Sequence, residues 1–258
     1  MAAKYFTIQN IYLRLDILEK YFIVMKNALI LCAGSARRLF GDGQNSPKCL
    51  LPLTSNSVIL DHLIRPLQAR GYNIILGTGC RHDLVAAHAE QYPGVRCVYN
   101  PDYQTTNSIV TLWQLRDFVA DSTLLINGDL VVDKSTFDAF TDEATPQVLT
   151  LPATSFDADS YRVLFDEHHA AVRMGKDIDD APAANCTAFT GISRVGNANR
   201  FLGEIENLLQ NGTKDTWPTT AYRNLIGQMP IRVHVLKDKL FFDVDTPEEF
   251  EAAKQAMA

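Results

Sequence analysis

The stretch Leu29-Ile-Leu-Cys-Ala-Gly-Ser-Ala-Arg-Arg-Leu39 carries most of the information that the sequence holds about the fold. Its apolar first half predicts a buried β-strand, and the small residues after it predict a turn where backbone N–H groups can approach a phosphate. Two arginines lie in that turn, and Lys48 follows in the segment Pro47-Lys-Cys-Leu-Leu-Pro-Leu53. Triphosphate chemistry needs this combination of close backbone approach and fixed positive charge. We therefore expect a phosphate-binding loop at the end of the first strand.

Strand-like and helix-like segments alternate through the first half of the chain. The expected strands cover residues 27–33, 72–77, 95–99 and 123–127, and the expected helices cover residues 58–70, 83–91 and 107–119. This order predicts β-α-β units, and hence an α/β fold with a Rossmann-like, mostly parallel sheet and helices on both faces. Ligands of such sheets bind beyond the carboxyl ends of the strands. The loop after residue 33 and the pair Gly128-Asp129 both lie at such ends.

The second half has a different pattern, which we expect to form a smaller lid on the acceptor side of the same domain. Residues 161–165 and 170–174 alternate like the strands of a hairpin. Further strands are expected at 187–193, 231–236 and 240–243, and helices at 199–209 and 220–227. Thr246-Pro-Glu-Glu249 predicts the start of a final helix, with a hydroxyl cap, a proline in the first turn and a glutamate that completes the capping box. No linker-like segment interrupts the chain, so residues 25–258 are expected to form a single domain.

Residues 1–24 precede the first expected strand as an N-terminal extension. They mix aromatic and aliphatic side chains with charged ones such as Arg14 and Glu19, a mixture too charged for a signal-peptide core. We expect an amphipathic helix that docks on a partner or on the domain itself. Translation starting at Met25 is the alternative, and the sequence does not separate the two.

Composition narrows the class of protein. The 258 residues are 47% hydrophobic and 21% charged, which is ordinary for a globular protein. The net charge of -6 argues against a protein that coats nucleic acid, whose affinity would come from an excess of basic residues. Five cysteines without Cys-x-x-Cys spacing indicate reduced thiols that serve as small buried side chains, and hence a cytoplasmic protein. No apolar run reaches the length of a membrane span.

Three aspartates are candidates for holding a metal ion. Asp129 follows an apolar strand, and Asp243 and Asp245 lie two residues apart on a strand-like run, so both of their carboxylates can face the same way. Mg²⁺ typically takes one or two carboxylates together with phosphate oxygens and water. The alternative is that Asp243 or Asp245 only caps the terminal helix.

The segments at residues 29–39 and 47–53 together resemble the signature of the nucleotidyltransferases that make NDP-sugars and CDP-alcohols. That signature is A-G-x-G-x-R-L followed by P-K-x-L. Ala36 stands where that signature has its second glycine. The resemblance implies that Arg38 and Lys48 are catalytic. It also implies that Asp129, Asp243 and Asp245 hold Mg²⁺, because relatives carry a metal-binding aspartate at the position of Asp129 and an acidic-x-D-T segment near the C-terminus. The residues that match the signature are Ala33, Gly34, Arg38, Leu39, Pro47, Lys48 and Leu50.

Residues 100–108 resemble, in part, a segment of bacterial phosphocholine cytidylyltransferases that opens a helix beside the nucleotide. Taken alone, the segment is an ordinary Thr/Asn helix cap. Beside the other motifs, it is expected to contact the nucleobase and ribose, which favours CTP. The expected nucleotide-binding residues are Leu31, Ala33, Gly34, Ser35, Ala36, Arg37, Gln104, Thr106, Asn107, Ser108 and Gly128.

The sequence therefore predicts a Mg²⁺-dependent cytidylyltransferase that transfers CMP from CTP to a small phosphorylated alcohol or phosphonate and releases pyrophosphate. The alternatives are a sugar-1-phosphate nucleotidyltransferase that uses UTP, dTTP or CTP, and a non-catalytic nucleotide-binding regulator. A dinucleotide-dependent oxidoreductase is disfavoured, because the loop lacks the remaining glycines of G-x-G-x-x-G. The sequence is compatible with a homodimer but does not determine the oligomeric state.

Two features of the family are absent from this chain. Sugar nucleotidyltransferases commonly carry Glu-Lys-Pro near the position of Met174-Gly-Lys176, and only the lysine is present here. Relatives that act on choline or sugars often have an aromatic-Glu pair where this chain has Trp217-Pro-Thr-Thr220. These departures predict an acceptor that is neither phosphocholine nor a common hexose phosphate.

Overall fold

The computed structural model describes residues 26–36, 39, 46–140, 145–152, 160–178 and 185–257. The N-terminal extension and both arginines of the signature loop, Arg37 and Arg38, lie outside the described residues. What we expect of them stays a prediction.

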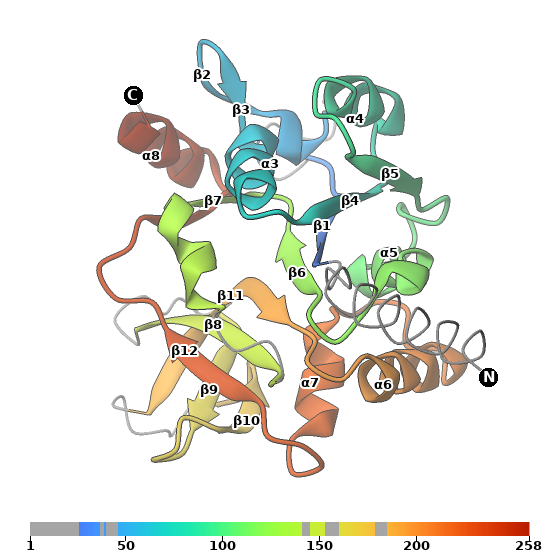
Figure 1. The fold of residues 1–258 in the computed structure, drawn as a ribbon, viewed down its shortest axis with the longest axis vertical. Coiled ribbons are helices and arrows are strands. Elements are labelled where there is room, and N and C mark those ends of the chain that lie inside the picture. The colour runs from blue at the N-terminus through green and yellow to red at the C-terminus, as the bar shows by residue number, and fades with distance from the viewer. Residues whose placement is uncertain are drawn as a thin grey trace, which may run out of the picture.

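Four parallel strands form the part of the sheet that carries the signature loop (Figure 1). The strand β1 (Asn27–Cys32) pairs with β4 (Asn73–Thr78) on one side and with β6 (Leu124–Asn127) on the other, and β5 (Arg96–Tyr99) extends the sheet beyond β4. All four strands end at the same edge, so the loops that follow them meet there. This arrangement confirms the expected α/β fold with its parallel central strands.

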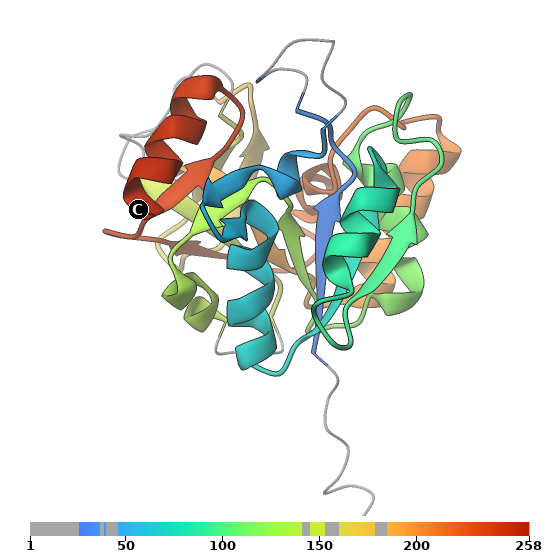
Figure 2. The same ribbon diagram turned by 90° about the horizontal axis from the view of Figure 1, so that it is seen from above.

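Helices cover both faces of this sheet (Figures 1 and 2). The helices α3 (Ile59–Ala69) and α4 (His82–Ala89) pack into one apolar cluster, and α5 (Ser108–Gln114) packs into the cluster on the opposite face. The expected helix over residues 107–119 ends earlier, at Gln114, and a short 3-10 helix, η2 (Arg116–Phe118), follows it.

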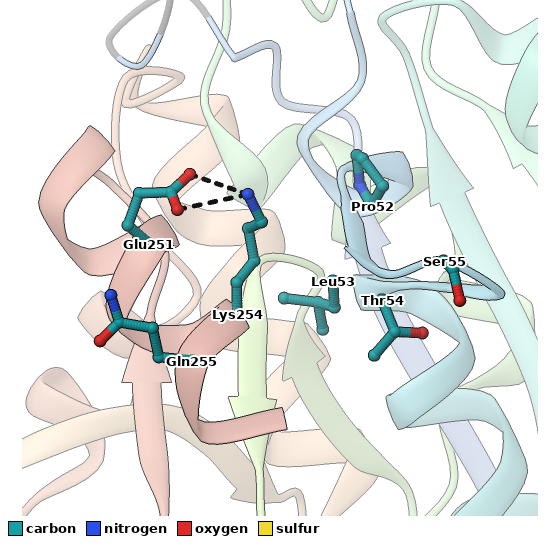
Figure 3. Close-up of a pocket in the computed structure, with 7 residues that line it drawn as sticks. All are labelled: Pro52, Leu53, Thr54, Ser55, Glu251, Lys254 and Gln255. Carbon is teal, nitrogen blue, oxygen red and sulfur yellow. Dashed lines mark hydrogen bonds and ion pairs between the residues drawn. The ribbon is translucent and has the colours of Figure 1, made fainter. Parts of the chain in front are cut away.

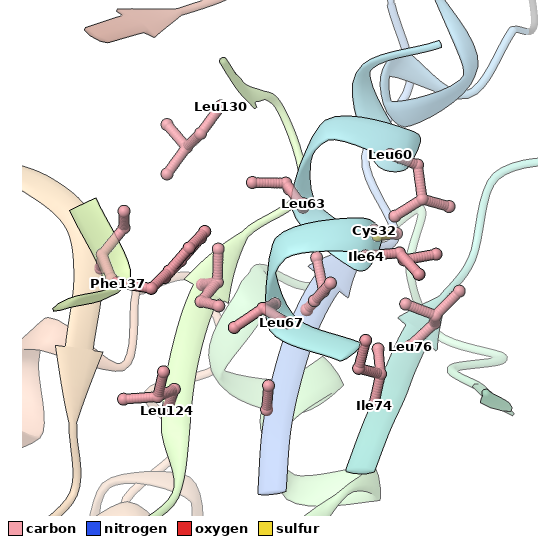
Figure 4. Close-up of a cluster of buried hydrophobic side chains, with 14 of the residues drawn as sticks. Cys32, Leu60, Leu63, Ile64, Leu67, Ile74, Leu76, Leu124, Leu130 and Phe137 are labelled. Atoms are coloured by element: carbon pink, nitrogen blue, oxygen red, sulfur yellow. The ribbon is translucent and has the colours of Figure 1, made fainter. Parts of the chain in front are cut away.

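The core explains why residues 28–32 form an uninterrupted apolar run. Ala28, Ile30 and Cys32 point into the cluster beneath α3 (Figure 4), and Leu29 points into the cluster beneath α5. A strand that is buried on both faces has no solvent side and therefore needs no polar alternation. Four residues at helical spacing fill the α3 side of the first cluster: Leu60, Leu63, Ile64 and Leu67.

The second half continues the same sheet. The strand β11 (Cys186–Arg194) runs antiparallel to β6 and also pairs with β8 (Gln147–Pro152) and β9 (Arg162–Phe165). The expected hairpin is present as β9 and β10 (Ala171–Gly175), and β12 (Arg232–Val235) lies parallel to β8. The helices α6 (Ala198–Gln210) and α7 (Thr219–Leu225) pack on the same face as α5. The two halves are thus joined through β11, and a lid over an acceptor stays a prediction.

Three short strands and two short 3-10 helices that the sequence analysis did not predict lie among the remaining elements, beside the strand expected at 240–243 and the helix expected from Thr246. The strand β7 (Leu130–Val132) pairs antiparallel with β13 (Phe241–Asp243), and the hairpin of β2 (Pro52–Thr54) and β3 (Ser57–Val58) follows the 3-10 helix η1 (Lys48–Leu50). A further 3-10 helix, η3 (Lys134–Ala139), follows β7, and α8 (Pro247–Met257) ends the described chain. None of the helices in the described ranges combines the length and the apolar character that crossing a membrane requires.

Candidate active site

The ammonium group of Lys48 lies between two carboxylates from distant parts of the chain. Lys48 begins η1 directly after Pro47, and only 8% of the residue is exposed. Its Nζ donates a hydrogen bond to Oδ2 of Asp129 at 3.1 Å and a second one to Oδ1 of Asp245. The structure therefore brings together a lysine and two aspartates that the sequence analysis assigned to catalysis and to metal binding.

Gly128 determines where Asp129 stands. The backbone N–H of Gly128 donates to the carbonyl of Leu31 at 3.1 Å, which holds the end of β6 against the end of β1. A Cβ atom at position 128 would lie 2.7 Å from Sγ of Cys32 and 2.8 Å from the Leu31 oxygen. Glycine is the residue that allows this approach, because it has no Cβ. The main structural role that these contacts indicate for Gly128 is close packing against β1, directly before Asp129.

Asp243 and Asp245 reach the site through the ribbon of β7 and β13. Asp243 is in register with Leu130, the residue after Asp129, and the Val244 N–H donates to the Asp129 carbonyl at 3.1 Å. Val244, which lies between the two aspartates in sequence, is fully buried. Because side chains alternate faces along an extended chain, Asp243 and Asp245 can both face away from the core, on the side opposite Val244.

The alternative in which Asp243 or Asp245 caps the terminal helix is wrong. The capping box that we expected from the sequence is present: the Glu249 N–H donates to Oγ1 of Thr246 at 3.2 Å, and the Thr246 N–H donates to Oε2 of Glu249 at 2.8 Å. The Asp245 N–H donates to the same glutamate oxygen at 2.9 Å. The box therefore fixes the backbone of Asp245 and leaves its carboxylate available to the site.

The three aspartates fit a divalent cation. One ligand oxygen from each of Asp129, Asp243 and Asp245 lies within 4.8 Å of the others. Burial, together with the charges of Asp129 and Asp245, raises the pKa of Asp243 well above its usual value. Burial lowers the pKa of Lys48, but the two carboxylates beside it outweigh this effect and hold that pKa above its usual value. A hard cation that prefers carboxylate oxygens, such as Mg²⁺, matches this set of donors.

The signature loop presents its backbone to open space at Gly34 and is anchored at Ala36. Gly34 is exposed, and no atom of the described residues, apart from its chain neighbours, lies within 4 Å of the place where a Cβ would be. The Ala36 N–H donates to the Ser46 carbonyl at 2.9 Å, and a β-bridge joins Ser35 to Pro47 beside Lys48. The methyl group of Ala36 is fully buried in the cluster that contains Leu51 and Val244, which explains why an alanine fits where the family has a glycine.

Gly34→Ala is expected to weaken nucleotide binding without weakening the fold. Within the part of the chain that the structure describes, a methyl group at position 34 meets no other atom, so thermal unfolding of the free protein is expected to stay unchanged. If phosphates approach this backbone, overpacking of about 1–3 kcal/mol would lower nucleotide affinity by roughly fivefold to 150-fold. Isothermal titration with a nucleoside triphosphate measures this loss.

Gly128→Ala provides the matched contrast, because its methyl group would strike Cys32 and Leu31. This variant is expected to lose about 1–3 kcal/mol of unfolding free energy. Unchanged nucleotide affinity in a folded Gly34→Ala protein would move the phosphates away from this loop.

The loop after β5 is held mainly by its own hydrogen bonds. The buried Asn100 donates from Nδ2 to Oγ1 of Thr111 at 3.0 Å and accepts from the Asp102 N–H at 3.0 Å. Oγ1 of Thr106 donates to the Asp102 carbonyl at 2.8 Å, and the Asn107 carboxamide accepts from the Ser108 N–H at 2.7 Å as the cap of α5. These contacts support the reading as a turn and helix cap.

Two of the four polar candidates in this loop have side chains that are not used in holding it. The Gln104 side chain is exposed and donates to the Tyr103 hydroxyl at 3.1 Å. Oγ of Ser108 is buried and finds no hydrogen-bond partner among the described residues. A buried hydroxyl without a partner is uncommon in folded proteins, and a bound ligand is one way to satisfy it. Ser108 is therefore the strongest of these candidates, and its role stays a proposal.

Gly79, which the sequence analysis missed, brings the signature loop and the loop after β5 together. It follows β4, and a Cβ there would lie 2.6 Å from Cβ of Tyr103 and 2.9 Å from Cβ of Ala33. The next residue, Cys80, donates from its N–H to the Ala33 carbonyl at 3.0 Å. A glycine directly after an expected strand was the available signal, since the carboxyl edge is where chains approach closely.

The cysteines at the site belong to the core. Cys32 and Cys49 are buried, and contact with Cys49 together with burial raises the pKa of Cys32 well above its usual value. A thiol that stays protonated is a poor nucleophile. This agrees with the prediction that the cysteines serve as small buried side chains.

A shallow groove between β2 and α8 flanks the site (Figure 3). It has a volume of about 430 Å³, and on its α8 side Lys254 pairs with Glu251 of the same helix, with Nζ to carboxylate oxygen distances of 2.9 and 3.2 Å. None of the described residues assigned to catalysis or metal binding lines this groove. The groove is lined by Pro52, Leu53, Thr54, Ser55, Glu251, Lys254 and Gln255.

Relatives among known proteins share parts of this chain. The bifunctional protein GlmU of Methanocaldococcus jannaschii is 28% identical over 107 residues, which are 42% of this chain and 26% of that protein. CMP-5'-(3-aminopropyl)phosphonate synthase of Streptomyces rubellomurinus is 27% identical over 234 residues, which are 85% of this chain and 37% of that protein. The chain thus spans about a quarter of the first relative and well under half of the second.

A solved structure has the same fold. The CTP:phosphocholine cytidylyltransferase from Streptococcus pneumoniae superposes with a TM-score of 0.77 at 19% identity, over 91% of this chain and 100% of that one. This likeness confirms the expected fold, a mostly parallel central sheet with helices on both faces.

The family is shown by a match to the MobA-like NTP transferase domain over residues 28–186. The match begins in β1, includes the signature loop, Lys48 and Asp129, and ends before Asp243. It confirms the resemblance to nucleotidyltransferases that the signature indicated. Because the match covers more than half of the chain, this protein belongs to the family of MobA-like NTP transferase domains.

Proposed function

We propose that this protein is a Mg²⁺-dependent cytidylyltransferase that transfers CMP from CTP to a small phosphorylated alcohol or phosphonate. One observation carries the proposal. A buried lysine from the signature and the carboxylates of Asp129 and Asp245 converge at the carboxyl edge of a parallel sheet. A cation that can bind phosphates, Lys48, thus lies beside carboxylates that can bind a metal, Asp129 and Asp245. The signature loop, with Gly34 at its exposed part, follows the neighbouring strand β1.

Each part of the site has a role in the proposed reaction. The backbone of the signature loop, with Arg38, holds the β- and γ-phosphates, and Lys48 stabilises the negative charge on the α-phosphate and the acceptor. Asp129 with Asp243 or Asp245 holds Mg²⁺, which when bound neutralises phosphate charge. An anionic oxygen of the acceptor forms a bond to the α-phosphorus. The bond from the α-phosphorus to the bridging oxygen breaks, and its electron pair leaves with pyrophosphate. No general base is needed, because the attacking oxygen is already ionised.

The choice of CTP and of the acceptor class rests on the relatives. The names of the relatives include a CMP-phosphonate synthase and a CTP:phosphocholine cytidylyltransferase, which use a phosphonate and a phosphorylated alcohol. Both acceptors present an ionised oxygen on phosphorus, and the proposed site needs no more than that at the reacting end. The differences in Met174-Gly-Lys176 and Trp217-Pro-Thr-Thr220 favour a different group at the other end of the acceptor.

CTP with Mg²⁺ is expected to raise the melting temperature more than ATP, GTP, UTP or dTTP at equal concentration. A ligand that binds only the native state stabilises it by about 2.7 kcal/mol at a hundred times its Kd. For a domain of this size, that free energy corresponds to roughly 5–10 °C. Differential scanning fluorimetry with the five nucleotides, each with and without Mg²⁺, measures the preference.

A pyrophosphate-release screen then tests the reaction. It crosses the nucleotides with phosphocholine, aminoethylphosphonate, inositol phosphate and hexose 1-phosphates. Release with CTP and a phosphorylated alcohol or phosphonate supports the proposal. A larger shift and faster release with UTP or dTTP and a hexose 1-phosphate would replace it with a sugar nucleotidyltransferase. Binding without release for any acceptor would favour a regulator. The single-domain organisation of residues 25–258, the homodimer and the cytoplasmic location stay predictions.

A further inference from the structure

Lys48 contacts two carboxylates that a metal ion would also need. Its ammonium group contacts carboxylate oxygens of Asp129 and Asp245, and these two residues and Asp243 form the candidate metal cluster. The ligand oxygens lie within 4.8 Å of one another, a space that one small cation fills. Mg²⁺ binds oxygens at about 2.0–2.1 Å and demands near-octahedral geometry. An ammonium group in hydrogen-bond contact with two of the same carboxylates would therefore lie close to the metal, and the two positive charges would repel each other.

The backbone around Lys48 is held in place, so the side chain has to take up any movement. The Leu51 N–H donates to the Lys48 carbonyl at 3.0 Å, and the Leu50 N–H donates to the Pro47 carbonyl at 3.1 Å. Cys49 is buried in the core cluster beneath α3, which anchors the turn from below. The long side chain of lysine has several rotatable bonds, so its ammonium can change partners while η1 stays fixed.

We propose that Lys48 is the resident counter-ion of the metal site: it links Asp129 and Asp245 in the metal-free protein, and a divalent cation displaces it towards the substrate phosphates. The inference rests on the proposed function, because it assumes that these carboxylates hold the metal. It adds an order of events, in which Lys48 becomes available to the phosphates once a cation has replaced it. By linkage, Lys48 must weaken metal binding by the same factor by which the metal weakens the Lys48 ion pairs.

The linkage is measured with Mn²⁺ alone, without nucleotide, by electron paramagnetic resonance of the free ion. Lys48→Met keeps an unbranched side chain but removes the charge, and it is expected to bind Mn²⁺ about tenfold or more tightly than the wild type, within the usual range of coupling between sites. Lys254→Met removes one positive charge from α8, where Lys254 pairs with Glu251, and is expected to bind Mn²⁺ like the wild type. Asp129→Asn is expected to bind Mn²⁺ more weakly than the wild type.

A second measurement uses the wild-type protein and needs no variant. Lysine acetylation by limiting acetic anhydride, followed by peptide mass spectrometry, reports how accessible each ammonium group is. Lys48 is expected to react slowly in the metal-free protein, because it is buried and paired, and several times faster when Mn²⁺ is added. The partly exposed Lys254, which pairs with Glu251 of its own helix, serves as the internal reference, and its rate is expected to stay constant.

The outcomes separate this inference from the proposed function. Tighter Mn²⁺ binding by Lys48→Met, with faster acetylation of Lys48 in the wild type, supports the displacement. Equal or weaker binding by a folded Lys48→Met protein overturns it, and so does an acetylation rate of Lys48 that Mn²⁺ does not change. In either case, if Asp129→Asn loses Mn²⁺ binding, the assignment of the three aspartates as a metal site would still be supported. If neither the wild type nor Lys48→Met binds Mn²⁺, the inference and the metal site both fail.

Discussion

Replacing Lys48 with methionine is expected to lower turnover by about two orders of magnitude or more. In the proposed reaction, negative charge builds on the α-phosphate and on the leaving pyrophosphate, and Lys48 is a buried, preorganised cation at that place. Removing one such electrostatic donor typically costs roughly a factor of 100–1,000 in kcat. Nucleotide affinity is expected to fall much less, because the signature loop still holds the triphosphate tail.

The Lys48 experiment compares steady-state pyrophosphate release for the wild type, Lys48→Met and the control Lys254→Met. The control removes the same charge at a distance from the carboxylates, and it is expected to keep wild-type turnover. Chemical denaturation establishes that each variant is folded. A folded Lys48→Met protein with near-normal kcat would contradict the assignment of Lys48 and, with it, the placement of the active site.

Asp129→Asn is expected to lower turnover strongly at ordinary Mg²⁺ concentration and to recover part of it as Mg²⁺ is raised. The change weakens one ligand of the metal but leaves Asp243 and Asp245 in place, so excess metal can partly compensate by mass action. Lys48→Met cannot be rescued in this way, because its defect is in phosphate stabilisation. If Lys48 also competes with the metal, Lys48→Met will reach saturation at lower Mg²⁺ than the wild type while staying slow.

The Asp129 variant is also expected to stay folded. Asparagine keeps the shape of the side chain, and the ammonium of Lys48 keeps its contact with Asp245, so no buried charge is left alone. A magnesium titration of turnover for both variants, run side by side, measures the difference. Equal, magnesium-independent losses in the two variants would show that Asp129 does not hold the metal.

Much of the fold is predictable from local sequence patterns. The apolar run that ends at Cys32, the helical spacing from Leu60 to Leu67 and the capping box at Thr246 each depend on contacts within a few residues or on simple two-sided burial. The carboxyl-edge rule for parallel sheets placed the signature loop and Asp129 at one edge. The residue types around Lys48 and Asp245 then indicated phosphate and metal chemistry before any contact was known.

Contacts between distant, short segments were not predictable in the same way. A strand as short as β7 has too few residues to show a periodic pattern, and its partner β13 lies more than a hundred residues further on. The pattern over residues 107–119 likewise predicted one continuous helix, whereas α5 ends at Gln114 and a 3-10 helix follows it. Local propensity is a weak signal in such segments, and tertiary packing overrides it.

The sequence by itself determined the α/β class, the resemblance to nucleotidyltransferases and the residue types of the candidate site, because those are properties of local pattern and chemistry. Only the tertiary structure decided that Lys48 meets Asp129, 81 residues away, and Asp245, 197 residues away. It also decided that Gly128 serves close packing against Cys32, and that the methyl of Ala36 turns into the core. The contacts of Lys48 depend on how the pair of strands β7 and β13 packs at the edge of the sheet. Packing between segments so far apart in sequence cannot be read from the local residue pattern of either segment.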